Sequence, residues 1–198
     1  MKLPSKKKMI SFIGGVLDSA DEKEKESGLY WYAEALRQCR SLSEKFNIPV
    51  PAVVGTVAAL SPGRNWEKNL YDAETFLNDF ARGLRARDLP LVGSYGWRNV
   101  EKAERICLGQ APQEALGGDK VQSFFYNIMY PTNETVVTID RHAASVACGM
   151  KLGEKDLKIS SSVYARIAEA YLTVAAERQL LGQQVQAITW VVWRNRNA

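Results

Sequence analysis

Apolar side chains recur every three or four residues along most of this chain, which is the spacing of one face of an α-helix. The clearest case covers residues 24–46, where Asn47 and Pro49 end the pattern. The same spacing predicts further helices over residues 53–60, 66–84, 97–108, 121–130, 163–181 and 183–194. We therefore expect a chain built almost entirely of helices that each bury one face.

One segment departs from the helical pattern. Residues 136–139, Val-Val-Thr-Ile, have the β-branched composition of a strand. The segment is too short and too isolated to build a sheet, so the prediction is an all-α fold. The chain has 198 residues, of which 46% are hydrophobic, and this suffices for a substantial core.

Composition narrows the class of protein only slightly. The formal net charge of +4 is compatible with a polyanionic partner but does not identify one. The three cysteines, Cys39, Cys107 and Cys148, are far apart and odd in number, which suggests neither a disulfide framework nor a zinc site. The apolar runs are shorter than the ~20 residues that span a bilayer. We expect a soluble, cytoplasmic protein with no membrane partner.

The segment from Leu116 to Ala143 carries the most chemical information. Gly117 and Gly118 permit a tight turn that can approach a phosphate, and the helix after them offers free backbone N–H groups at its amino end. Lys120 lies in the first turn of that helix, where the helix dipole disfavours the ammonium form. A more nucleophilic amine results, although an ordinary surface lysine has the same sequence context.

Asp140 follows the apolar run and precedes a helical segment. Its carboxylate is suited to capping that helix by accepting backbone N–H groups. His142 is the only histidine, and without other ligand types nearby a metal role is not indicated. Packing or hydrogen bonding is the simpler role for His142, as capping is for Asp140.

Three elements in order, Gly-Asp-Lys-Val at 118–121, an apolar helix, and Ile-Asp-Arg-His at 139–142, resemble a known signature. It is that of the helix-hairpin-helix DNA glycosylases, which include endonuclease III and the oxidised-guanine glycosylases. In that family a glycine hairpin precedes the helix with the lysine nucleophile, and an Asp-x-His sequence supplies an essential aspartate. The resemblance implies that Lys120 and Asp140 are catalytic, and that Gly117, Gly118 and His142 contact DNA.

A second segment extends this resemblance to about residues 50–145. Residues 53–70 look like the family's apolar helix followed by the loop that wedges into the duplex. An arginine and an aromatic ring there could fill the gap left by a displaced base, while a capping and packing turn is the alternative. The residues of this loop are Pro62, Arg64, Asn65 and Trp66.

The chain also departs from the family pattern. The hairpin glycines of the family are separated by one residue, whereas Gly117 and Gly118 are adjacent and Leu116 stands at the place of the first. The four-cysteine cluster of some relatives is absent from the sequence, so no iron–sulfur centre is implied.

The resemblance implies a two-lobed glycosylase fold that flips a base out of double-stranded DNA. One lobe would comprise residues 50–145, and the other residues 1–49 with 146–198. The implied activity is that of a DNA N-glycosylase with AP lyase activity, without a cofactor or an inferred protein partner. Two alternatives stay open, a glycosylase-fold enzyme of phage-type DNA base hypermodification and a catalytically silent DNA-binding module.

Overall fold

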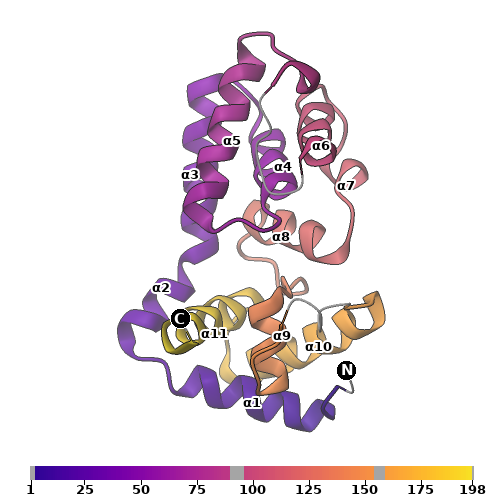
Figure 1. The fold of residues 1–198 in the computed structure, drawn as a ribbon. Coiled ribbons are helices and arrows are strands. Elements are labelled where there is room, and N and C mark those ends of the chain that lie inside the picture. Colours follow the sequence, from indigo (N-terminus) through magenta and orange to yellow (C-terminus); the bar gives the residue numbers. More distant parts are fainter. Residues whose placement is uncertain (1–2, 90–95, 154–158, 198) are drawn as a thin grey trace. The chain divides into compact units, whose positions relative to one another are not determined.

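The computed structural model describes residues 3–89, 96–153 and 159–197, and every regular element in those residues is helical (Figure 1). The predicted all-α fold is confirmed at this level. In chain order the helices are α1 (Lys6–Asp18), α2 (Glu22–Leu29), α3 (Trp31–Phe46), α4 (Val50–Leu60), α5 (Trp66–Ala81), the 3₁₀ turn η1 (Ala86–Asp88), α6 (Trp97–Cys107), α7 (Pro112–Ala115), α8 (Asp119–Met129), α9 (Arg141–Cys148), α10 (Ser161–Arg178) and α11 (Gly182–Asn197).

The chain forms two compact units and passes from one to the other twice. Unit 1 comprises Met1–Glu34 with Tyr130–Ala198, and unit 2 comprises Ala35–Met129. Both boundaries come earlier in the chain than residues 50 and 145, where the sequence prediction puts them. Lys120 therefore belongs to unit 2 and Asp140 to unit 1, whereas the prediction assigns both residues to one lobe.

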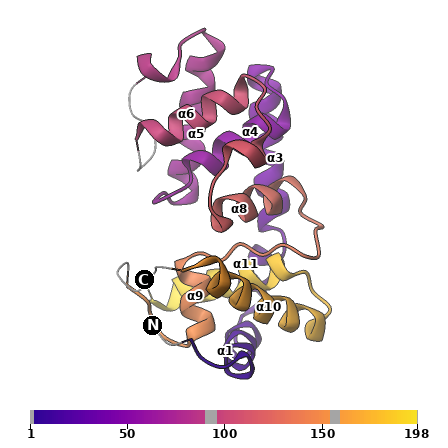
Figure 2. The same cartoon turned by 90° about the vertical axis from the view of Figure 1, so that its right-hand side faces the viewer.

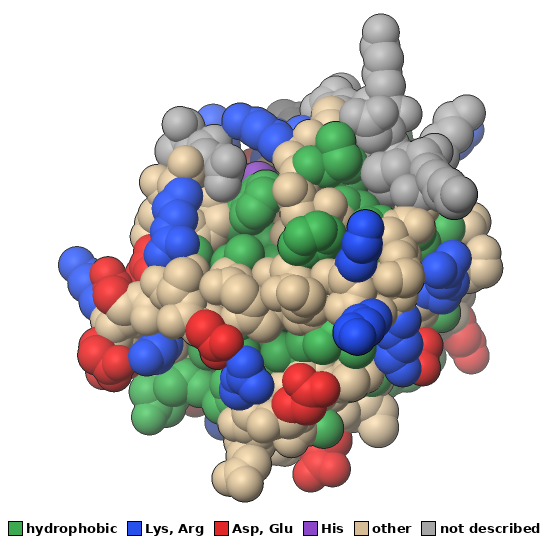
Figure 3. All heavy atoms as spheres, turned by 90° about the horizontal axis from the view of Figure 1, so that it is seen from below, with side chains coloured by type: hydrophobic (Ala, Val, Ile, Leu, Met, Phe, Trp, Pro, Cys, Tyr) green, Lys and Arg blue, Asp and Glu red, His purple; other side chains and the backbone are tan. Residues whose placement is uncertain are grey.

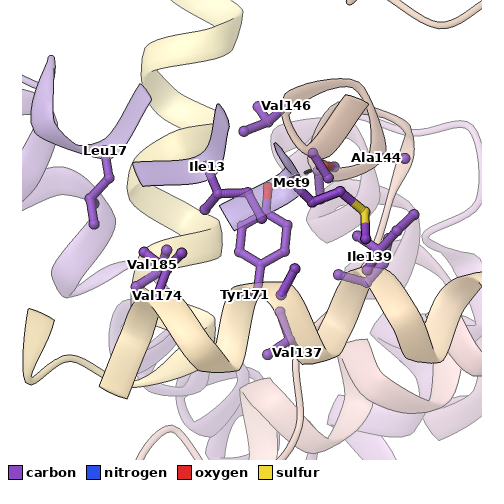
Figure 4. Packing of buried hydrophobic residues seen from close by; sticks show 14 of the residues in the cluster. Met9, Ile13, Leu17, Val137, Ile139, Ala144, Val146, Tyr171, Val174 and Val185 are labelled. Carbon is purple, nitrogen blue, oxygen red and sulfur yellow. Dashed lines mark hydrogen bonds between the residues drawn. The ribbon is translucent and has the colours of Figure 1, made fainter. Parts of the chain in front are cut away.

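The core of unit 1 is assembled from distant parts of the chain. Met9, Ile13 and Leu17 are buried on one face of α1, which contacts α9, α10 and α11 (Figures 1 and 2). Tyr171 of α10 lies fully buried among these side chains (Figure 4), and its hydroxyl donates a hydrogen bond to the carbonyl of Ala143. The apolar face of α1 thus depends on helices from the other end of the sequence.

The core of unit 2 is organised around α4. Its residues from Ala52 to Leu60 are all buried, and α4 contacts α5, α6, α7 and α8. A helix that is apolar on every side fits only the interior of a bundle. Gly55 allows a close approach to α6, because a Cβ there would lie 2.9 Å from Ile106.

The helix predicted over residues 24–46 is two helices, α2 and α3, which are separated at Tyr30. Tyr30 ends α2 with φ −100° and ψ 0°, outside regular helix geometry. In the last turn of α2, Gly28 lies against the backbone of α11, so that a Cβ there would be only 2.5 Å from the Ile188 Cα. This contact holds α2 on α11. The spacing of apolar residues does not predict the contact, because it depends on a helix distant in sequence.

The strand-like residues 136–139 have no regular secondary structure. Val137 and Ile139 are instead buried in the core of unit 1. The β-branched composition of this segment therefore reflects burial, and the Tyr164 hydroxyl bonds two of its backbone groups.

We predict that Gly28→Ala destabilises unit 1, although alanine favours a helix. The added methyl group would overlap Ile188, and overpacking of this kind costs about 1–3 kcal/mol. Gly15 in α1 is the matched control, because nothing lies within 4 Å of a Cβ there. Gly15→Ala should raise the free energy of unfolding by about 0.5–1 kcal/mol. Denaturant titration of both variants measures the difference, and effects of the same sign would contradict the prediction.

Candidate functional site

The hairpin between α7 and α8 is fixed by hydrogen bonds on both sides. The Leu116 N–H donates to the Pro112 carbonyl at 2.8 Å, and the Gln122 side chain donates to the Leu116 carbonyl at 3.0 Å. Gly118 adopts φ +80°, a conformation that L side chains rarely take. The adjacent glycines therefore form a tight turn that leads directly into α8.

Lys120 is the second residue of α8, and its side chain is exposed. In the part of the chain that the structure describes, it has no hydrogen bond or ion pair with another side chain. The first turn of an α-helix also leaves backbone N–H groups without helical acceptors. The Lys120 amine consequently stands at the positive end of α8, where a ligand can reach it.

The loop before α5 includes two predicted DNA-binding residues with clear structural contacts. Asn65 caps α5 by accepting the Lys68 backbone N–H at 2.9 Å. Arg64 forms an ion pair with Asp72, with 2.8 Å between Nε and Oδ2. These contacts stabilise the loop, and the contact of these residues with DNA stays a prediction.

The same loop is joined to the hairpin region within unit 2. Trp66 donates its indole N–H to Gln38 at 3.0 Å, and its ring packs edge-on against Phe124 of α8. Pro62 and Gly117 line one cavity of about 350 Å³. The structure thus brings together two segments that the sequence motifs single out separately.

The rest of this cavity is lined by residues that the sequence motifs miss. They are Ala59, Val121 and, from α6, Arg98, Asn99 and Lys102. Arg98 and Lys102 are four residues apart, so they share one face of the helix. That spacing is the only signal in the sequence, and it is common on solvent-exposed helices.

Asp140 is half-buried and caps α9, because its Oδ1 accepts the Ala143 N–H at 2.8 Å. Two buried phenols of unit 1 lie near it. Burial raises the pKa of Tyr32 and of Tyr171, and the negative charge of Asp140 raises both further. Neither phenol therefore exchanges protons near neutral pH.

The Tyr164 side chain holds part of the backbone that leads into Asp140. The Tyr164 hydroxyl accepts the N–H of Ile139 and donates to the carbonyl of Val137, both at 2.9 Å. A neighbouring strand would satisfy these groups in a sheet. The hydroxyl takes the place of that strand and fixes the chain immediately before Asp140.

His142 lines a second cavity of about 560 Å³ in unit 1. Its ring packs edge-on against Trp190, and the Arg194 guanidinium lies over the same Trp190 ring, 4.5 Å from its centre. The remaining lining residues are Arg141, Ser145, Lys151, Leu152, Gly153, Trp193 and Arg194, which the sequence motifs do not identify as a group.

The charge of the two cavity linings differs from the mixed charge seen on the surface of the molecule. Figure 3 shows one face of the molecule, on which Lys and Arg side chains are interspersed with Asp and Glu. Exposed ion pairs such as Lys6–Glu169 and Arg178–Asp18 likewise join charges of both signs. The described residues that line both cavities include basic side chains and no acidic ones, a charge that suits an anion.

Metal and thiol chemistry find little support among the described residues. There, no group of three or more His, Cys, Asp or Glu side chains is arranged to hold a metal ion. Burial raises the pKa of Cys39 to about 12 and that of Cys107 to about 11, so neither thiol is a nucleophile near neutral pH.

Across the described residues, none of the helices has both the length and the apolar character needed to cross a membrane.

A protein-family model matches the chain over nearly its whole length. The chain belongs to a family of unknown function (DUF7178). The match covers residues 2–197 and so includes both units. No curated protein and no solved structure matches the chain significantly. Membership of the DUF7178 family assigns no activity, and a function has to be argued from the site itself.

We predict that Tyr164→Phe destabilises the segment before Asp140. The ring stays, but the N–H of buried Ile139 loses its acceptor, and an unsatisfied buried donor costs about 1–3 kcal/mol. Exposed Tyr71 is the control, and Tyr71→Phe should change stability by less than about 0.5 kcal/mol. Thermal unfolding and hydrogen exchange at the Ile139 amide measure the effect. Unchanged exchange at that amide would show that the hydroxyl does not hold the segment.

Proposed function

We propose that this chain is a DNA N-glycosylase with AP lyase activity, acting on double-stranded DNA in the cytoplasm, and that its two units are the lobes of a helix-hairpin-helix glycosylase fold. The observation that carries the proposal is the hairpin geometry. Gly118 leads directly into α8, and Lys120 is exposed in its first turn. The sequence resemblance assigns the nucleophile to this position.

The protein must offset the cost of taking a base out of the duplex, a few kcal/mol of lost stacking. The hairpin binds phosphate through backbone N–H groups. The loop from Pro62 to Trp66 fills the gap that the flipped base leaves between its neighbours in the duplex. Support for a joint role comes from the cavity that Pro62 and Gly117 share. The basic residues around His142 add affinity that does not depend on sequence.

Lys120 is the nucleophile of the proposed reaction. Its neutral amine forms a bond from Nζ to the anomeric C1′ while the bond from C1′ to the base breaks, and the base leaves with the electron pair and gains a proton. Opening of the sugar ring then gives an imine between Nζ and C1′, which permits strand cleavage. Exposure of Lys120 supports this role, because the amine must reach the sugar.

Asp140 stabilises the positive charge that develops on the deoxyribose as the glycosidic bond breaks. Its Oδ1 accepts the capping hydrogen bond from Ala143, which leaves Oδ2 for the sugar. Half-burial supports this role, since a charge acts more strongly where water is partly excluded.

The proposal predicts a covalent complex that borohydride can trap. Incubating the protein with duplexes that carry a panel of damaged bases and abasic sites, followed by reduction of the imine, should give a stable adduct. Lys120→Gln should abolish this adduct and leave duplex binding intact. Lys68→Gln is the matched control, an exposed lysine in the first turn of α5, and should still form the adduct.

The outcome of this experiment also separates the alternatives. An adduct that persists in Lys120→Gln would move the nucleophile to another residue. Duplex binding without an adduct on any lesion would overturn the lyase proposal and favour a silent DNA-binding module. A base that changes in mass without leaving the strand would favour a hypermodification enzyme.

A second prediction separates the charge of Asp140 from its capping role. Asp140→Asn keeps an oxygen that can accept the Ala143 N–H, so stability should hardly change. Base release in a single turnover should nevertheless fall by about 10²- to 10³-fold, as expected when transition-state charge loses a partner. Asp140→Ala should also lose about 1 kcal/mol of stability with the cap. Full activity in Asp140→Asn would show that the charge of Asp140 has no part in base release and that the residue acts only as a helix cap.

A further inference from the structure

The cavity beside the hairpin has a wall of polar side chains from α6. Arg98, Asn99 and Lys102 all line it, and their spacing places them within one side of that helix. The other described residues that line it are apolar or small, namely Ala59, Pro62, Gly117 and Val121. Among the described residues, no acidic side chain lines the cavity, so none of them balances the charges of Arg98 and Lys102 there.

Asn99 is the most informative of these residues. It is only 8% exposed, and no hydrogen bond of its side chain to another described residue is found. Buried side-chain amides almost always have a partner, because leaving one unsatisfied costs free energy. Among the described residues, the Asn99 amide is not one of the polar atoms that are both closed off from solvent and without a partner, so it is open to a ligand on the side where it lines the cavity.

Lys102 extends this wall to the hairpin. Its Nζ lies 4.0 Å from the position that a Cβ would occupy on Gly117, so the ammonium stands directly beside the turn. Val121, in the first turn of α8, also lines the cavity. The positive end of the α8 dipole therefore adds to the charges of Arg98 and Lys102.

We propose that this cavity binds a phosphate group, with Arg98, Asn99 and Lys102 as its side-chain ligands. Two cations, an unpartnered amide donor and a helix amino end match the charge and the several acceptor oxygens of phosphate. A volume of about 350 Å³ accommodates the group with the atoms attached to it. The phosphate comes either from a DNA strand or from a small phosphate monoester. The inference goes beyond base excision, because it requires binding and no turnover.

The first arm of the test measures duplex binding against salt concentration, by fluorescence anisotropy of an undamaged duplex. Each lost phosphate contact should make the slope of log K against log[salt] shallower by about 0.9. Arg98→Gln and Lys102→Gln should each make the slope shallower, and the double variant, which loses this one phosphate contact, should change it by about 0.9 in total. Arg82→Gln and Lys23→Gln remove exposed charges outside the cavity and serve as controls.

The second arm uses inorganic phosphate and observes the side-chain amide signals of Asn99 in the ¹⁵N-labelled protein by NMR. The Asn99→Leu variant identifies these signals by their absence. Because the replaced amide has no described partner, this variant should fold with undiminished stability. A marked loss of stability would show that the amide has a structural partner and would contradict the argument from Asn99.

The two arms together identify the source of the phosphate. A shallower salt slope in Arg98→Gln and Lys102→Gln, with no response to inorganic phosphate, assigns the cavity to the DNA backbone. Saturable shifts of the Asn99 signals that vanish in the double variant, with an unchanged slope, assign it to a monoester. An unchanged slope and no shift would overturn the phosphate site. Because neither arm measures base release, failure of the glycosylase proposal gives a different pattern, in which phosphate binds but no base leaves.

Discussion

Burial of α1 against helices from the far end of the chain is the constraint on which the rest of the structure depends. Met9, Ile13 and Leu17 find their partners on α9, α10 and α11. The chain must therefore leave unit 1 after its first helices and return to it later, and unit 2 is the continuous stretch between. As a result, the two residues of the proposed catalytic pair belong to different units. Lys120 lies in unit 2, before the chain re-enters unit 1 at Tyr130, and Asp140 lies after that point.

Helical periodicity predicts most helices of this chain because each buries a stripe of its own surface, which is a local property of the sequence. The exceptions depend on distant contacts. The break at Tyr30 follows a close approach of Gly28 to Ile188. In residues 136–139, the Tyr164 hydroxyl bonds the N–H of Ile139 and the carbonyl of Val137, which a neighbouring strand would bond in a sheet. Val137 and Ile139, which the sequence prediction includes in the lobe of residues 50–145, pack in the core of unit 1 through similar distant contacts.

The candidate site is predictable where a residue type has a local signature. Adjacent glycines before a helix indicate a turn, and an aspartate before a helix indicates a cap; both are present, at Gly117–Gly118 and Asp140. Arg98, Asn99 and Lys102 have no such signature. A basic pair at helical spacing occurs on many exposed surfaces, and the burial of Asn99 without a partner is a property of the fold alone.

The discontinuity of unit 1 also sets an order of events during synthesis on the ribosome. Domains generally fold as units while the chain emerges, and contacts between residues close in sequence form first. The helices around α4 are consecutive, so unit 2 can assemble as soon as α8 has left the exit tunnel. The apolar face of α1 stays exposed until Tyr171 and its neighbours are made. The hairpin is thus complete before the aspartate has a folded environment, so a nascent chain gains the unit with the proposed phosphate site first.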